Sequence, residues 1–222
     1  MHASTESETD TDRHDGAARE KSTAEIQDVY ADLASKFARW ERLERLFAGR
    51  YRRAQFGDAT GRVLDVACGT GSNFRYLDDA EEVVGIDLSP AMLAEARDSL
   101  DAAPVDGSLQ QMDAQQLAFP ADRFDTVISA LSTCTFPEPV ATLREMERVC
   151  APEGRILLFE HGRSDVSAVA RFQDWRADAH YEKTGCRWNQ EPLELVEDAG
   201  LSVERVETAV LGIFTMVEAT PK

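Results

Sequence analysis

The sequence predicts an α/β fold in which a doubly wound, seven-stranded sheet carries helices on both faces. Three observations lead to this prediction. Short runs rich in Val, Ile and Leu alternate along the chain with longer amphipathic runs of helical period. The apolar runs are nearly continuous, which is typical of parallel strands buried on both faces. The first of them ends in a glycine-rich turn, as in open α/β sheets that bind ligands at their strand ends.

The helical period begins at residue 23, and we expect Gly49 to end or bend this first helix. The second helix has Pro90 at its first position, and the last lies between an Asn189 cap and Gly200. The strands are expected at residues 62–67, 82–87, 108–112, 124–129, 155–160, 201–207 and 212–219. The helices are expected at residues 23–53, 89–100, 140–150, 164–182 and 190–199, with a further helix opening after the glycine-rich turn.

The connection between the last two strands is too short for a crossover helix. The final strand should therefore run antiparallel to its neighbour, because parallel neighbours need a connection of a dozen or more residues.

One folded domain is expected over residues 23–222. Residues 1–22 are rich in Ser, Thr, Asp and Glu and hold no large apolar side chain, so we predict an acidic, disordered tail. No export signal or spanning segment is apparent, and a cytoplasmic location is expected. The cysteines (Cys68, Cys134, Cys150, Cys186) form no CxxC pair, so the spacing predicts neither a metal site nor disulfides.

The formal net charge is −17, with 41 acidic against 24 basic residues. This balance argues against nucleic-acid binding, which depends on Lys and Arg contacts to phosphates. Only four of the basic residues are lysines. A lysine-poor acidic surface is typical of proteins from a salty cytoplasm, where self-repulsion is screened, and we hypothesise halophilic adaptation.

The strongest motif is the run VLDVACGTGS, in which Asp65 lies inside a strand and Gly69 and Gly71 form the turn after it. Glycines allow close backbone approach and positive φ. A dinucleotide fingerprint would place a third glycine at position 74, which is Phe74 here. A carboxylate at position 65 also suits a positively charged ligand better than a pyrophosphate.

Two further acids follow neighbouring predicted strands. Asp87 ends the second strand, where a carboxylate can accept hydrogen bonds from ribose hydroxyls, and Asp113 and Ala114 follow the third, where they can contact an adenine edge. The three acids around one glycine turn predict a ligand with a ribose and positive charge. S-adenosylmethionine fits that description, and a dinucleotide does not.

These motifs resemble the class I S-adenosylmethionine-dependent methyltransferases, at LDVACGTGSNF, VVGIDLSPAMLAEAR, QQMDAQQLAFP and FDTVISALSTCTFPEP. The resemblance implies a Rossmann-like sheet of order 3-2-1-4-5-7-6 and a lid formed by the first helix. It implies that Asp65, Gly69 and Gly71 hold the methionine end of the cofactor. Asp87 would bind the ribose, and Leu88 and Met92 would flank the adenine. The implied cofactor-binding residues are Asp65, Gly69, Gly71, Asp87, Leu88, Met92, Asp113, Ala114 and Ser129.

The methyl acceptor is left open by the sequence. The chain is most similar to the ubiquinone/menaquinone-biosynthesis methyltransferase group, and it shares Cys134, Glu160-His161 and Gly185-Cys186 with small-thiol and phospholipid N-methyltransferases. A quinone precursor, a lipid amine and a thiol are all candidate acceptors. His161, at a strand end, is the candidate general base, although it could equally bond a neighbouring loop.

A basic segment lies between Arg39 and Arg53 on the first helix, beside Trp40 and Phe47. Such a helix can lie on an anionic lipid surface, although its arginines could instead pair with the acidic body.

Two alternative functions remain open. A non-catalytic cofactor-binding or scaffold protein would share the fold, and an NAD-dependent oxidoreductase is disfavoured by Phe74 and Asp65.

Overall fold

The computed structural model describes residues 19–222, apart from the side chains of Glu41 and Arg42. Most of the predicted tail, residues 1–18, therefore lies outside the described residues. The strands are β1 (Gly61–Val66), β2 (Ala80–Asp87), β3 (Gly107–Gln111), β4 (Phe124–Ala130), β5 (Cys150–His161), β6 (Ser202–Ala209) and β7 (Phe214–Thr220). The helices are α1 (Thr23–Phe56), α2 (Pro90–Asp101), α3 (Pro139–Val149), α4 (Ser167–Thr184) and α5 (Pro192–Ala199), with short 3-10 turns η1 (Phe74–Tyr76) and η2 (Thr133–Thr135).

The seven strands form one sheet in the order β3-β2-β1-β4-β5-β7-β6, as the resemblance implies. The five strands β1 to β5 pair in parallel, and β7 runs antiparallel to both β5 and β6. The prediction from the short last connection is thus confirmed. The carboxyl ends of the five parallel strands meet at one edge, where the side chains that follow them converge.

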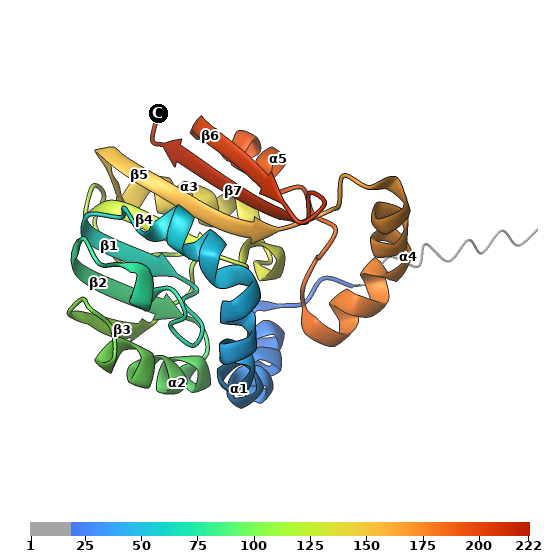
Figure 1. The fold of residues 1–222 in the computed structure, drawn as a ribbon, viewed down its shortest axis with the longest axis horizontal. Coiled ribbons are helices and arrows are strands. Elements are labelled where there is room, and N and C mark those ends of the chain that lie inside the picture. Colours follow the sequence, from blue (N-terminus) through green and yellow to red (C-terminus); the bar gives the residue numbers. More distant parts are fainter. Residues whose placement is uncertain (1–18) are drawn as a thin grey trace, which may run out of the picture.

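Helices cover both faces of the sheet (Figure 1). On one face Leu143 of α3 and Val196 of α5 pack against inward side chains of the strands, and on the other Phe56 of α1 and Ala96 of α2 do so. Because successive side chains of a strand point to opposite faces, Leu64 and its neighbours are divided between the two cores. Helix α4 lies off the strand ends, to the right in Figure 1.

Helix α1 is longer than predicted. It begins at a capping box in which the Ser22 side chain accepts the Glu25 N–H, while the Glu25 carboxylate accepts the Ser22 N–H. Of the two alternatives for Gly49, an end or a bend, the end is excluded, because α1 continues to Phe56, which is fully buried. The glycine instead allows close packing, since a Cβ there would lie 2.8 Å from the Tyr76 hydroxyl.

The segment after the glycine-rich turn also differs from the prediction. It forms only η1, because few residues separate the turn from β2. The last helix begins after Glu191, not after an Asn189 cap, and the Asn189 side chain donates to Asp174 instead. Within residues 19–222, no helix combines the length and the hydropathy needed to cross a membrane.

Candidate active site

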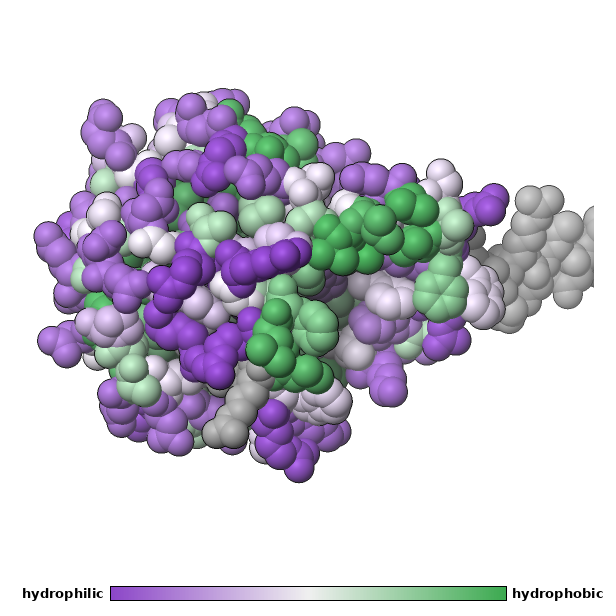
Figure 2. Space-filling model, viewed as in Figure 1, coloured by the Kyte–Doolittle hydropathy of each residue, from purple (hydrophilic) through white to green (hydrophobic). Residues whose placement is uncertain are grey.

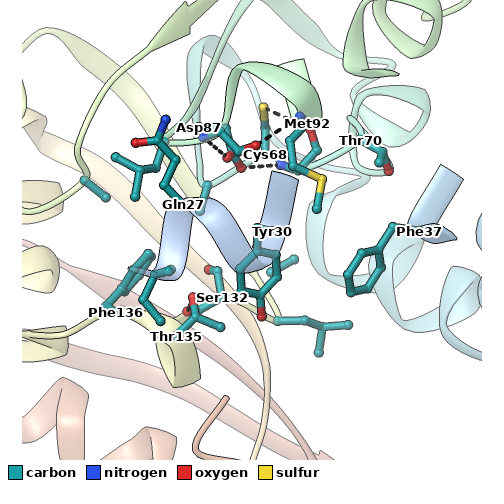
Figure 3. A pocket seen from close by; sticks show the side chains of 18 of the residues that line it. Gln27, Tyr30, Phe37, Cys68, Thr70, Asp87, Met92, Ser132, Thr135 and Phe136 are labelled. Atoms are coloured by element: carbon teal, nitrogen blue, oxygen red, sulfur yellow. Dashed lines mark hydrogen bonds between the residues drawn. The ribbon is translucent and has the colours of Figure 1, made fainter. Parts of the chain in front are cut away.

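A cavity of about 370 Å³ lies at the carboxyl ends of β1, β2 and β4, beneath α1 (Figure 3). Its volume falls within the range usual for small-molecule sites. Figure 3 shows the side chains of Tyr30 and Phe37 projecting from α1 into the space that Thr70 and Met92 also face. Predicted residues that line the cavity are Gly69, Asp87, Leu88, Met92, Asp113 and Ala114.

The glycine turn presents its backbone to this cavity. Gly69 has φ +56, and a Cβ at this position would meet no atom within 4 Å. Gly71, with φ +78, does not line the cavity, and a Cβ there would lie 2.6 Å from the Phe74 ring. The two glycines therefore serve different needs: one leaves room for a ligand, and the other lets Phe74 pack beneath the turn.

Asp87 connects β2 to the glycine turn. Its Oδ2 accepts the Gly69 N–H at 2.9 Å, and its Oδ1 accepts the Ser89 N–H at 2.8 Å. Burial raises the pKa of this carboxyl, and the hydrogen bonds from Ser89, Gly69 and Leu88 oppose that rise. A carboxylate accepts at about four lone-pair sites, so these three backbone bonds still leave acceptor capacity for a ligand hydroxyl.

Asp65 lies behind the glycine turn, fully buried, and does not line the cavity. The Asn73 side-chain N–H group donates to both of its oxygens, at 3.1 and 3.0 Å. Arg52 of α1 in turn donates to the Asn73 oxygen and, at 3.0 Å, to Glu44. Burial raises the pKa of Asp65 to about 7, although the Asn73 bonds and the Arg52 charge lower it.

This polar network was not expected from the sequence. Arg52 is only 6% exposed and belongs to the network, so it is not available to the basic surface proposed for residues 39–53. Arg53 likewise pairs with Asp78, and Arg50 donates to Tyr51. The position of Asn73, two residues beyond the second glycine, was the one local signal for the network.

Asp113 lies at the end of the cavity near the start of α1. Its Oδ1 accepts the Gln115 N–H at 2.9 Å, and the Gln115 side chain reaches Thr23 Oγ1 at 3.3 Å. The carbonyl oxygen of the same side chain accepts the Glu138 N–H. Gln115 therefore joins the loop after β3 to both the first turn of α1 and the start of α3.

Ser129 is buried at the end of β4 and does not line the cavity, whereas Ser132 does. The Ser132 N–H donates to Glu160 Oε2 at 2.9 Å, and the Ser129 hydroxyl lies 3.5 Å from Oε1 of the same carboxylate. Burial raises the pKa of Glu160 to about 7, against the His161 charge and these bonds. Glu160 thus supports the loop after β4 from behind the cavity wall.

His161 faces two cysteines and does not line the cavity. Its Nε2 lies 3.3 Å from Cys134 Sγ and 3.4 Å from Cys186 Sγ, and the two sulfurs are 3.2 Å apart. Burial opposes the charged imidazole, but the Cys186 contact raises the pKa of His161 overall. The three residues are 25 to 52 positions apart in the chain, so spacing could not predict their approach.

The comparisons with known proteins agree with this geometry. A model of the methyltransferase domain family matches residues 64–158. The chain is 35% identical to phosphatidylethanolamine N-methyltransferase of Cereibacter sphaeroides, over 64% of this chain and 74% of that protein. It is 34% identical to demethylmenaquinone methyltransferase of Deinococcus radiodurans, over 61% and 59% of the two chains.

A further relative is the mitochondrial methyltransferase OMS1 of Saccharomyces cerevisiae, 26% identical over 87% of this chain. The match spans less than half (45%) of the yeast protein. Among solved structures, the fold is shared with a chain solved in complex with the Haloferax volcanii Trm112 methyltransferase activator, with a TM-score of 0.73, 19% identity and coverage of 89% and 98%. The fold, the family model and the Cereibacter relative together place the chain in the class I S-adenosylmethionine-dependent methyltransferases, which take their methyl group from S-adenosylmethionine.

Proposed function

We propose that this methyltransferase transfers its methyl group to a lipid-borne acceptor that enters beneath α1. The observation that carries the proposal is the apolar face of this helix. Phe37 and Trp40 line the cavity and are also exposed, so the apolar wall of the site continues onto the surface. A water-soluble acceptor would not require such a path, because exposed aromatic side chains at a cavity mouth favour an apolar ligand.

The residues of the cavity fit the cofactor. In the proposal, the open backbone at Gly69 lies against the methionine part, Asp87 accepts the ribose hydroxyls, and Met92 and Asp113 contact the adenine. Bound S-adenosylmethionine supplies a methyl group on a positively charged sulfur. The chain's own contribution is to align the acceptor with that methyl and to keep water away, which is the main source of rate in such a displacement.

In the proposal, the protein docks on a lipid surface through apolar patches beside the cavity mouth. Leu46 and Phe47 of α1 are 77% and 67% exposed. Figure 2 shows a hydrophobic patch over α1 and a second over the β6–β7 turn and the start of α4, on the same face. The second patch includes Val166, Val210 and Leu211. Arginines at positions 39 and 45 are exposed on the same helix and could meet anionic headgroups.

The names of two relatives support an acceptor of this class. One is named for methylation of phosphatidylethanolamine and the other for methylation of demethylmenaquinone, and both of these molecules carry long apolar chains. No role as general base is proposed for His161, since its ring faces the two cysteines behind the cavity wall.

Transfer of label from S-[methyl-³H]adenosylmethionine tests the proposal. The acceptors offered in parallel are phosphatidylethanolamine in anionic vesicles, a demethylmenaquinone in the same vesicles, and a small water-soluble thiol, all in molar KCl. We expect label in one of the two vesicle-borne molecules and little in the thiol. Labelling of the thiol alone, at a rate that vesicles leave unchanged, would overturn the lipid assignment. Asp87→Asn is the inactive reference, and Asp79→Asn, at an exposed aspartate, is the matched control.

A further inference from the structure

A cluster of two thiols and an imidazole lies behind the cavity wall and has no part in the proposed methyl transfer. Cys134 belongs to η2, His161 ends β5, and Cys186 lies between α4 and α5. Their ligand atoms, the two Sγ and one ring nitrogen, all lie within 4.8 Å of one another. Both cysteines are buried, and no other such group of three is found among residues 19–222.

Contacts outside the cluster bring these three elements together, and none of them involves the side chains of Cys134, His161 or Cys186. The Arg187 N–H donates to the Cys134 carbonyl at 2.8 Å, which joins the α4–α5 connection to η2. The Gln190 side chain donates to Thr133 Oγ1 at 2.6 Å, across the same junction. His161 pairs with Phe214 in the β5–β7 ladder. The three ligands are therefore held in place by hydrogen bonds independent of their own contacts.

We propose that Cys134, His161 and Cys186 bind one thiophilic divalent metal ion, with Zn²⁺ as the expected occupant. Cysteine sulfur and histidine nitrogen are the ligands that Zn²⁺ prefers, and three protein ligands leave a fourth position for water or another group. His180 of α4 lies beside Cys186. Binding displaces one proton from each thiol and changes no oxidation state.

The distances suit an ion at the centre of the cluster. In a tetrahedral site with bonds of about 2.3 Å to sulfur and about 2.0 Å to nitrogen, the ligand atoms are roughly 3.5 to 3.8 Å apart. The observed separations are 3.2 to 3.4 Å, so each ligand needs to move outward by only a few tenths of an ångström. Two thiolates also balance the charge of a divalent cation, so that the buried site would carry no net charge.

A disulfide between the two cysteines is the competing arrangement. It would require the sulfurs to approach to about 2.05 Å and would leave the imidazole without a partner. The nearly equal distances from His161 Nε2 to both sulfurs favour a centre shared by all three. The ion would join the α4–α5 connection to the ends of β4 and β5, directly behind the loop that carries Ser132 into the cavity.

Metal binding is tested on the full chain, without any assay of methyl transfer, so its outcome is separate from that of the proposed function. Protein stripped with a chelator under a reducing agent is titrated with Co²⁺, a spectroscopic substitute for Zn²⁺, in molar KCl. We expect one Co²⁺ per chain, a sulfur-to-cobalt charge-transfer band, and loss of that band when Zn²⁺ is added. No band in folded protein would overturn the proposal.

Variants identify the ligands. Cys134→Ser, Cys186→Ser and His161→Gln should each weaken Co²⁺ binding by about 100-fold or more, whereas Cys150→Ser, at a buried thiol outside the cluster, should leave it unchanged. In case a ligand variant fails to fold, alkylation of the wild-type protein gives the same information. Zn²⁺ should protect Cys134 and Cys186 from iodoacetamide without altering modification of Cys150. Equal modification with and without Zn²⁺, or a Cys134–Cys186 disulfide that persists under the reducing agent, would contradict the site.

Discussion

The carboxylate of Asp87 accepts the backbone N–H of Gly69 at 2.9 Å, so the acid that ends β2 holds the glycine turn that follows β1. Replacing Asp87 therefore affects the site in two ways, since it removes the proposed ribose acceptor and releases the turn. We expect Asp87→Ala to weaken S-adenosylhomocysteine binding by about 10- to 100-fold, because hydrogen bonds to charged groups contribute about 1.5–3 kcal/mol. Calorimetric titration measures the change, with Asp79→Asn as the control. An affinity equal to that of the wild type would remove Asp87 from the site.

Stability should depend on pH through Asp65. Burial raises its pKa to about 7 in the folded protein, while the unfolded carboxyl titrates near its ordinary value of 3.8. Between pH 4 and pH 7 the Asp65 carboxyl is protonated in the folded state and ionised in the unfolded state. Its contribution to the free energy of unfolding is therefore full below about pH 4 and is lost as the pH rises through about 7. Asp65→Asn cannot titrate. We expect its melting temperature to fall less between pH 5 and pH 8 than that of the wild type. Parallel curves for the two proteins would contradict the assignment.

The Arg52 network should contribute strongly to stability. Its side chain is buried between Glu44 and Asn73, and its removal leaves buried polar groups without a partner. We expect Arg52→Ala to lower the free energy of unfolding by about 3 kcal/mol. The neighbouring Arg53, whose side chain is 60% exposed in its pair with Asp78, provides the control. Arg53→Ala should cost less than about 1 kcal/mol. Urea unfolding measures both free energies. Equal losses for the two variants would show that the buried network contributes no more than an exposed ion pair.

The apolar face of α1 should carry any binding to lipid. We expect Leu46→Asp and Phe47→Asp each to reduce co-sedimentation with anionic vesicles several-fold, since each places a charge at the lipid interface. Val206→Asp, on the edge strand β6, introduces the same charge at another partly exposed apolar position and should have little effect. If the wild type does not sediment with vesicles at low or high salt, the membrane contact is wrong.

Salt should stabilise the protein if the acidic surface is a halophilic adaptation. Repulsion within a net charge of −17 is screened more strongly at molar salt, where the Debye length falls to about 3 Å. We expect the melting temperature to rise by several degrees between about 0.1 M and about 1 M KCl. Thermal unfolding followed by circular dichroism measures it, and a melting temperature independent of KCl would contradict the hypothesis.

Sequence reasoning succeeded where a function lies in one short segment. The strands, the glycine turn and Asp87 each follow from a pattern within a few tens of residues. These patterns predicted the sheet and the position of the cavity at its strand ends. It failed where side chains meet across long separations. Asp65 was predicted in the site but is covered by Asn73 and Arg52. His161 was predicted either as a base or as a partner of a neighbouring loop, and its ring faces two cysteines. Residue spacing indicated only Asn73, because the other contacts depend on how α1 and the α4–α5 connection pack.

The way α1 is attached determines how the cavity can open. The second half of the helix is anchored by Phe56 in the core and by Arg52 through Asn73 to Asp65. The first turn is held by the buried Ile26 and by two part-buried hydrogen bonds, from the Lys21 N–H to the Tyr181 hydroxyl and from Gln115 to Thr23. We expect exchange of spent for fresh cofactor to move the first half of α1 while the half anchored at Arg52 stays in place.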